Sequence, residues 1–353
     1  MVIVPRNTVY IVVSCDVDPD RVGFLDGVPS ESLAWRGMTE GIPAVKQLLC
    51  GLKDSAEREP VFTWLLRADE QVRTLQGAYG WVVQAHEAFL RSLQQTGDEL
   101  GWHPHLWRRD LGTGSWVQEL QDVDWQVDML ERAHADLTAC LPSEVKSVRM
   151  GWAYHNTRTC CALGDLGVAV DLSPLPGYRT LTGRLPARRE NLFDWYVSPR
   201  APFRPSRADY RRPAREGEEA CRVLEVPGFV STSLPWSLVG GLQLARKTRD
   251  LAQLWQAVRR PTYCINVTAR AVYFAPLVRQ LRKALRAKNG PVVFSTSFHA
   301  DELLPNRSRL YDLGSVRSNL EALVRACHDA DTPVEFVQAR RIPALFTPWS
   351  SAS

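Results

Sequence analysis

Apolar residues follow two patterns that alternate along the chain. Short runs rich in Val, Ile, Leu and aromatic residues, such as residues 9–14, are typical of parallel strands buried on both faces. Longer stretches, such as residues 41–52, repeat their apolar residues at helical spacing. Strands are predicted at residues 9–14, 61–66, 99–106, 147–152, 168–172, 223–226, 292–296 and 334–338. Helices are predicted at residues 41–52, 74–95, 123–141, 157–166, 250–259, 277–288 and 316–330.

Repeated alternation of strands and helices predicts an α/β fold with a parallel sheet, most simply a closed or nearly closed barrel. An α/β barrel commonly uses about 250 residues as one domain, so the 353 residues are assigned to a single domain, 1–353. Residues 178–221 break the alternation and are dense in Pro and Arg. We expect this segment to be a loop insertion over the barrel; the alternative is a lid whose arginines meet an anionic part of a substrate.

Composition and charge narrow the class of protein. With 45% hydrophobic and 23% charged residues the chain is globular, and 43 basic against 39 acidic residues argue for neither a nucleic acid nor a membrane partner. The start of the chain does not have the pattern of a signal peptide, and the uncharged residues 226–245 are interrupted by Pro and Gly, which argues for a loop and the start of a buried helix. Eight cysteines without a CxxC spacing are expected to be reduced. These features predict a soluble, cytoplasmic protein.

Polar residues gather where the predicted strands end, which is where a barrel places its chemistry. Asp16 and Asp18 follow the first strand, and alternate residues of an extended segment point the same way. His103 and His105 have the same spacing on the third strand. Two imidazoles and one carboxylate from a neighbouring strand can bind a divalent metal ion and leave a position open for water.

Three further strand ends carry Arg149, Asp171 and His299. Each has an ordinary alternative: Arg149 could lie on the surface, and the acidic residues that follow His299 could cap the next helix. The combination of Asp, His, Arg, Asp and His at five strand ends is harder to explain by solvation alone. The remaining histidines lack such a context and are interpreted as structural or surface residues; they are His86, His134, His155 and His328.

The order of these motifs resembles the polysaccharide deacetylase superfamily, the NodB-homology or carbohydrate esterase family 4 group, from residue 9 to about residue 304. The resemblance implies a distorted (β/α)7-type barrel and hydrolysis of N-acetyl or related acyl groups with one divalent metal ion. Asp16 matches the catalytic base and Asp18 a metal ligand of the first motif. The second motif's Gly-x-Glu-Leu-Gly-x-His sequence appears at residues 97–103 and makes His103 a ligand. Arg149 matches the residue that steadies the base, Asp171 is the candidate for orienting the catalytic histidine, and His299 matches that histidine.

Two positions depart from the usual motifs. Val17 separates the two aspartates, as in a branch with an Asp-x-Asp form, and the second histidine of the usual motif is replaced by Trp107. His105 is the nearby imidazole that could serve as third ligand. The His-Ala-Asp-Glu-Leu-Leu sequence at residues 299–304 resembles an intracellular branch.

The resemblance implies a metal-dependent N-deacetylase acting on an amino sugar or a sugar-containing intermediate, with Zn²⁺ as the expected ion. Asp16 would be the general base, His299 the general acid, and Trp102, Trp107 and Trp152 could stack against a sugar ring. The absence of an export signal favours a small cytoplasmic substrate over cell-wall glycan. Two alternatives stay open: hydrolysis of a non-sugar amide or cyclic imide, and a non-catalytic sugar-binding protein of this fold. The oligomeric state does not follow from the sequence.

Overall fold

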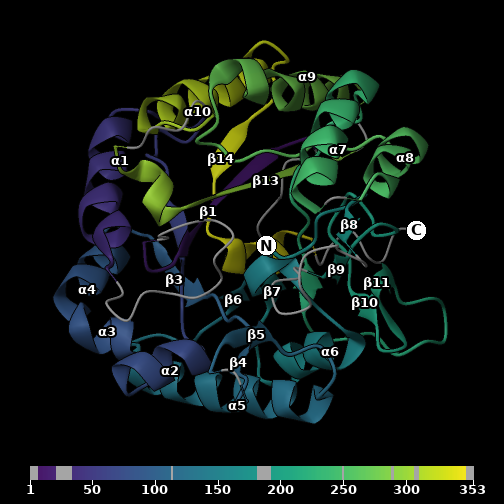
Figure 1. Ribbon diagram of the computed structural model, residues 1–353. Helices are drawn as coiled ribbons and strands as arrows, with labels where there is room; N and C mark the ends of the chain where they lie inside the picture. The colour runs from purple at the N-terminus through teal and green to yellow at the C-terminus, as the bar shows by residue number, and fades with distance from the viewer. Residues whose placement is uncertain are drawn as a thin grey trace.

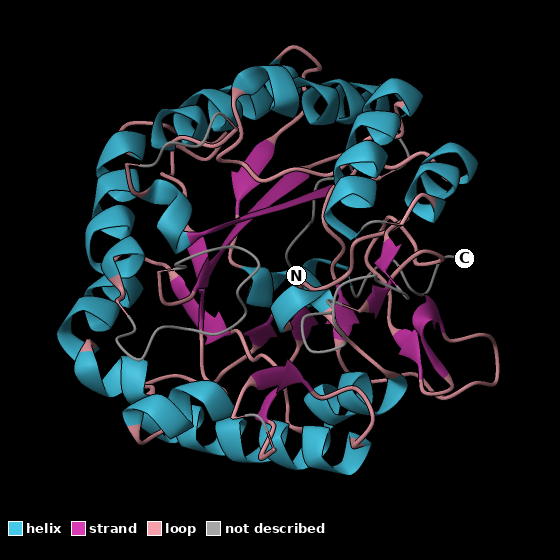
Figure 2. Cartoon of the chain, viewed as in Figure 1, coloured by secondary structure: helices cyan, strands magenta, loops and turns pink. Residues whose placement is uncertain are grey.

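A computed structural model describes residues 7–20, 34–112, 114–180, 192–248, 250–287, 290–305 and 310–346. Its centre is a parallel sheet with the strand order β12-β7-β6-β3-β2-β1-β13, and β14 pairs with β1 beside this path. Helices surround the sheet (Figures 1 and 2). The strands are β1 (Val9–Val17), β2 (Phe62–Leu66), β3 (Glu99–Trp102), β6 (Ser147–Val148), β7 (Val170–Asp171), β12 (Leu224–Glu225), β13 (Val292–His299) and β14 (Val334–Phe336). The order agrees with the predicted α/β, (β/α)7-type barrel.

The gap between the two edge strands of this path, β12 and β13, is bridged by single backbone hydrogen bonds from the segment that follows β12 to β13. The amide of Phe229, which follows β12, donates to the carbonyl of Ser295 at 2.8 Å, and the amide of Val267 donates to Ser297 at 3.1 Å. Irregular backbone therefore lies where a closed barrel would have another pair of strands. This arrangement is the distortion that the sequence resemblance implies.

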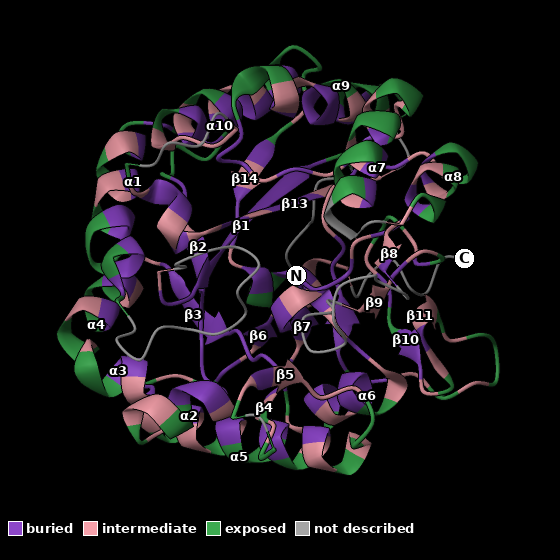
Figure 3. Cartoon of the chain, viewed as in Figure 1, coloured by how far each residue is buried: buried purple, intermediate pink, exposed green. Residues whose placement is uncertain are grey.

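Side chains of β1 alternate between two apolar layers. Val9, Ile11 and Val13 belong to the core between the sheet and the helices, whereas Tyr10 and Val12 pack in a second cluster that includes Ile342 from α11 (Ile342–Phe346). Burial colouring shows the strands buried and the outer faces of the helices exposed (Figure 3). Because strand side chains alternate, Asp16 lies in the same row as Tyr10 and Val12, at the carboxyl end of the strand.

The helices differ from prediction mainly in their bounds. They are α1 (Ile42–Leu49), α2 (Glu70–Gln76), α3 (Trp81–Ala85), α4 (Glu87–Gln95), α5 (Val123–Cys140), α6 (Thr157–Asp165), α7 (Leu234–Thr248), α8 (Ala252–Arg259), α9 (Ala271–Ala287) and α10 (Leu313–His328). The single helix predicted at residues 74–95 is wrong. Asp69 caps an earlier start, and Gly77, with a left-handed φ of 93°, ends α2 after seven residues.

The insertion at residues 178–221 was expected to be a loop, but its described part, which excludes residues 181–191, contains regular strands. It forms the hairpins β8 (Arg179–Thr180) with β9 (Phe193–Asp194) and β10 (Pro205–Ser206) with β11 (Asp209–Pro213). A further hairpin, β4 (Trp107–Arg109) with β5 (Trp116–Gln118), follows β3.

None of the described helices has the length and apolarity needed to cross a membrane.

Candidate active site

Parallel pairing of β1 with β13 places Asp16 directly beside His299. The two residues are register partners, although 283 positions separate them in the sequence. Oδ2 of Asp16 lies 3.6 Å from Nε2 of His299. The Asp16 side chain is 6% exposed and that of His299 is 29% exposed, so the carboxylate is shielded while the imidazole reaches solvent.

Arg149, which follows β6, holds Asp16 from the other side. Its Nη1 donates to Oδ1 of Asp16 at 2.9 Å, its Nη2 to Oγ of Ser14 at 2.8 Å, and its Nε to the carbonyl of Leu172 at 3.1 Å. Burial raises the pKa of Asp16, but the charge of Arg149 and the neighbouring imidazoles of His103 and His299 outweigh it and leave that pKa below its usual value. Asp16 is therefore an ionised carboxylate in a fixed orientation.

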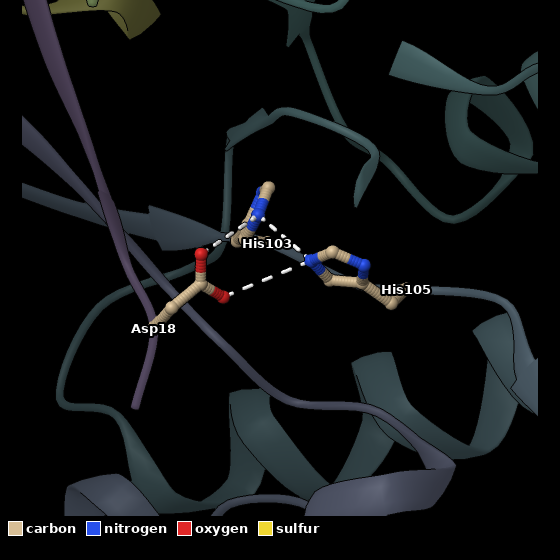
Figure 4. Close-up of side chains that lie close together, drawn as sticks. All are labelled: Asp18, His103 and His105. Atoms are coloured by element: carbon tan, nitrogen blue, oxygen red, sulfur yellow. Dashed lines mark hydrogen bonds and ion pairs between the residues drawn. The ribbon is translucent and has the colours of Figure 1, made fainter. Parts of the chain in front are cut away.

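The three predicted ligands meet beside this pair. Oδ2 of Asp18 lies 3.6 Å from Nε2 of His103, Oδ1 lies 3.7 Å from Nε2 of His105, and the two Nε2 atoms are 3.1 Å apart (Figure 4). Ligand atoms bound at about 2.0–2.1 Å around a tetrahedral zinc ion are roughly 3.3 Å from one another. All three residues are buried, and their separations match those of a metal site.

Hydrogen bonds test whether these residues suit a metal ion. Nδ1 of His103 lies 2.7 Å from the carbonyl oxygen of Arg149, which can only accept, so Nδ1 carries the proton and the Nε2 lone pair faces Asp18. The buried Oδ1 of Asp18 accepts no hydrogen bond from the described residues. Asp18 and His103 thus fit a divalent cation as they stand.

His105 has the right position but the less suitable tautomer. The indole N–H of Trp107 donates to its Nδ1 at 2.9 Å, which leaves the proton of the neutral ring on Nε2, where it can point to Nε2 of His103. Burial, aided by the charge of Arg67, lowers the pKa of His105 to about 4, so the ring is neutral. Binding a metal ion through Nε2 requires the proton to leave this nitrogen and the Trp107 indole to shift.

We expect Trp107→Phe to tighten zinc binding on the order of tenfold, because the phenyl ring has no N–H to compete for Nδ1. Competition titration with a chromophoric chelator measures the zinc Kd. Val117→Ala in the same β4–β5 hairpin is the control for a general loosening of this hairpin. Weaker binding by Trp107→Phe would contradict this account and assign the indole a supporting role for the ligand.

Three-dimensional comparison shows which known proteins share this architecture. The chain aligns over 98% of its length with a crystal structure from Parabacteroides distasonis provisionally assigned as a glycoside hydrolase/deacetylase, at 13% identity, 72% coverage of that chain and a TM-score of 0.58. The chain therefore shares its barrel fold with this structure. A Puue allantoinase structure also aligns, over 98% of this chain and 92% of that chain, at 12% identity and a TM-score of 0.51. No family model and no curated protein matches the sequence.

Within this barrel, Asp171 does not have its predicted role beside His299. Both Asp171 and His155 are fully buried, and Nε2 of His155 lies 2.8 Å from Oδ2 of Asp171. The carboxylate next to Nδ1 of His299 is Glu302, at 3.4 Å. The turn Ala300–Leu303 brings Glu302 back over the preceding imidazole, a return that the strand-end rule did not anticipate. His155 agrees with its interpretation as a structural residue.

Glu302 is itself held in place. Asn266 donates to its carboxylate at 2.9 and 3.1 Å, and the hydroxyl of Thr268 donates at 2.6 Å. Burial raises the pKa of Glu302, but hydrogen bonds from His299, Thr268 and Asn266 outweigh it and leave that pKa below its usual value. Glu302 is therefore an ionised group that can orient His299.

We expect Glu302→Gln to lower kcat on the order of tenfold or more and to move the alkaline limb of the pH–rate profile to lower pH. The reason is that protonated His299 loses a neighbouring negative charge. As a comparison, Asp171→Asn should lower the free energy of unfolding by about 1–3 kcal/mol and leave the position of that limb unchanged. If Asp171→Asn moved the alkaline limb and Glu302→Gln changed only the free energy of unfolding, Asp171 would be the partner of His299 after all.

Two of the three tryptophans predicted to bind substrate are buried instead. Trp102 has no exposed surface, and its indole N–H donates to the carbonyl of Ala68 at 2.8 Å. Trp107 is 4% exposed and contacts His105. Trp152 is partly exposed, and its ring packs against that of Trp107 with centroids 4.8 Å apart. Contact of Trp102 and Trp107 with substrate was therefore a wrong prediction, and Trp152 remains a prediction.

The sequence analysis missed Arg67 and Asp69, which follow β2. Nη1 of Arg67 lies 3.7 Å from Oδ1 of Asp18, and Oδ2 of Asp69 accepts hydrogen bonds from Nε of Arg67 at 2.8 Å and from the His105 amide at 3.1 Å. These contacts join the first metal-ligand strand to the segment carrying His105. Polar residues at the end of the second strand were the available signal, by the same rule that found the others.

Proposed function

We propose that this chain is a metal-dependent hydrolase that removes an N-acetyl or similar acyl group from an amino sugar or sugar-containing intermediate. The observation that carries the proposal is the position of Asp16, which lies between Arg149 and His299 and next to the Asp18–His103–His105 group. A sugar-binding module needs neither a buried base with its own arginine nor an adjacent imidazole. This combination favours catalysis over binding alone.

Asp16 and His299 would share the proton transfers. Asp16, kept ionised by Arg149, accepts a proton from the attacking water, and His299, the more exposed of the two, donates one to the departing nitrogen. Glu302 orients His299 through Nδ1. General acid or base catalysis of each proton transfer raises the reaction rate by a factor on the order of 10²–10⁴.

Asp18, His103 and His105 would hold one divalent ion, with Zn²⁺ the ion best matched to one carboxylate and two imidazoles. Such an ion supplies a lowered pKa of bound water and polarisation of the carbonyl oxygen. An amide needs both kinds of assistance, because its carbonyl is a poor electrophile and its amine a poor leaving group.

The compartment and the domain organisation belong to the same proposal. All eight cysteines lie among the described residues and are free, which supports a reducing compartment and hence a cytoplasmic substrate. The barrel and its insertion at residues 178–221 would form one domain, with the insertion as a partial cover over the mouth.

The test is release of acetate from N-acetylated mono- and disaccharides by protein loaded with zinc, compared with chelator-treated protein. Hydrolysis that depends on the metal supports the proposal. Sugar binding without hydrolysis under any metal would instead identify a binding protein of this fold.

A second candidate is hydrolysis of a non-sugar amide or cyclic imide on the same residues. It is favoured by the structural match to an enzyme whose name is allantoinase. Cyclic amides and imides assayed beside the N-acetyl sugars separate the two candidates by their kcat/KM values.

A further inference from the structure

A pocket of about 380 Å³ lies between the β8–β9 hairpin and helix α8, which are neighbours in Figure 1. Arg179 and Tyr196 line it from the hairpin, and Trp255 and Arg259 line it from the helix. Trp255 is 68% exposed, which is unusual for so large an apolar side chain. None of these residues belongs to the site around Asp16.

Positive charge gathers around this pocket, and the residues that the structure describes do not balance it. The guanidinium of Arg179 lies 4.8 Å and that of Arg260 5.8 Å from the ring centre of Tyr196. Within the described part of the chain, Arg200 and Arg260 donate to the backbone carbonyls of Pro261 and Ser198, at 3.0 and 2.6 Å. Among the described residues, no carboxylate forms an ion pair with these arginines or with Arg259.

Three arginines of the insertion at residues 178–221 provide a contrast. Arg207 pairs with Asp165 at 3.1 Å, Arg211 with Asp209 at 2.9 Å, and Arg212 with Glu218 at 2.6 Å. Burial lowers the pKa of both Arg200 and Arg260, and the mutual repulsion of their charges adds to this for Arg200. An anion would relieve the charge at the pocket, whereas the paired arginines have no such need.

The surrounding sequence strengthens the positive field. Residues 226–300 contain eleven Lys and Arg residues and a single acidic residue, Asp250. In the rest of the chain acidic residues outnumber basic ones, because the overall totals are 43 and 39. A field of this sign attracts anions toward the segment that carries α8.

Topology places the pocket on the same side of the barrel as the active site. The β8–β9 hairpin follows the carboxyl end of β7, and α8 lies in the connection that follows the carboxyl end of β12. Asn266 is seven positions after Arg259, and a fully extended chain covers at most about 25 Å over that distance in sequence. Asn266 binds Glu302, which lies beside His299, so one extended molecule can reach both places.

We propose that this pocket binds a phosphate or diphosphate group carried by the substrate, so that the amino sugar is recognised as a phosphate ester. The inference deepens the proposed function and rests on it for the identity of the substrate, although anion binding itself can be measured without turnover. Arg179 and Arg259 bind the phosphate oxygens, for which the planar guanidinium is well suited. Trp255 offers a flat face to the group on the other side of the phosphate, either a nucleobase or a lipid chain.

Calorimetric titration of the full-length protein with inorganic pyrophosphate tests the pocket. Arg179→Gln and Arg259→Gln should each weaken binding on the order of tenfold, because each removes charge-assisted hydrogen bonds. Arg286→Gln, which removes the same charge from an exposed position on α9, is the matched control and should bind like the wild type. Because these variants keep Asp18, His103 and His105, pyrophosphate bound through a metal ion contributes equally to all of them.

The source of the phosphate is distinguished by two further probes. Tighter binding of uridine diphosphate than of pyrophosphate, lost in Trp255→Ala, supports a nucleotide sugar. Binding to vesicles that contain phosphatidic acid, again lost in Trp255→Ala, supports a lipid phosphate. Equal pyrophosphate affinity in the wild type and both pocket variants overturns the proposal, while hydrolysis of simple N-acetyl sugars then still decides the proposed function separately.

Discussion

Asp16→Asn is expected to lower kcat on the order of 10²- to 10⁴-fold while the protein keeps its bound metal. The amide has the shape of the carboxylate but cannot accept a proton, and Asp18, His103 and His105 are untouched. Turnover is measured as acetate release and metal content by mass spectrometry of the purified protein. Near-normal turnover would show that a group other than Asp16 accepts the proton.

Asp54→Asn is the matched control for this experiment. Asp54 is 3% exposed and pairs with Arg58 at 3.0 Å, so it is also a buried carboxylate with an arginine partner. Asp54 follows α1 and accepts a hydrogen bond from the backbone amide of Phe336 at 3.2 Å. Phe336 pairs with Ile11 of β1, five positions before Asp16. Both variants should lose stability, because each leaves a guanidinium without its full charge partner, but only Asp16→Asn should lose turnover.

Asp18→Ala is expected to lose metal and turnover together. Burial raises the pKa of Asp18, but the neighbouring imidazoles of His103 and His105 and the charge of Arg67 outweigh it and hold that pKa well below its usual value, so the side chain is an anion available to a cation. Loss of a direct ligand should weaken metal binding by more than the roughly 10- to 100-fold that follows loss of an outer partner.

The same metal measurement on His105→Ala decides the third ligand. Loss of metal in both Asp18→Ala and His105→Ala agrees with the three-residue site. Metal retained in His105→Ala would place the third ligand elsewhere, and metal retained in Asp18→Ala would contradict the site altogether. Asp16→Asn, which should retain metal, is the control for both.

The predictable part of the site is the part carried by strands. A continuous apolar run fixes where β1 lies, and strand alternation then fixes that Asp16 and Asp18 point the same way. The strand-end rule likewise located Arg149 and His299. Their mutual contacts follow from parallel pairing, which brings the end of β13 beside the end of β1.

The parts that failed depend on turns and on long-range packing. The choice between Asp171 and Glu302 as partner of His299 is decided by the tight turn after β13, which the spacing of charged residues does not reveal. The position of Trp102, in contrast, follows from strand alternation, because it lies on the face opposite His103, in the core between the sheet and the helices, where its indole donates to the carbonyl of Ala68. The turn is a property of the assembled barrel, and local sequence patterns contain little information about it.

The spacing of Asp16 and Asp18 on one strand makes the base and the metal ligand inseparable. Val17 between them has no exposed surface and packs in the outer core, opposite to the two carboxylates. A deletion or insertion of one residue in β1 would therefore move both carboxylates to the opposite face of the strand, into the apolar core. Evolution could adjust this site by substitution at either aspartate, but any change of strand length would remove the base and the metal ligand in a single step.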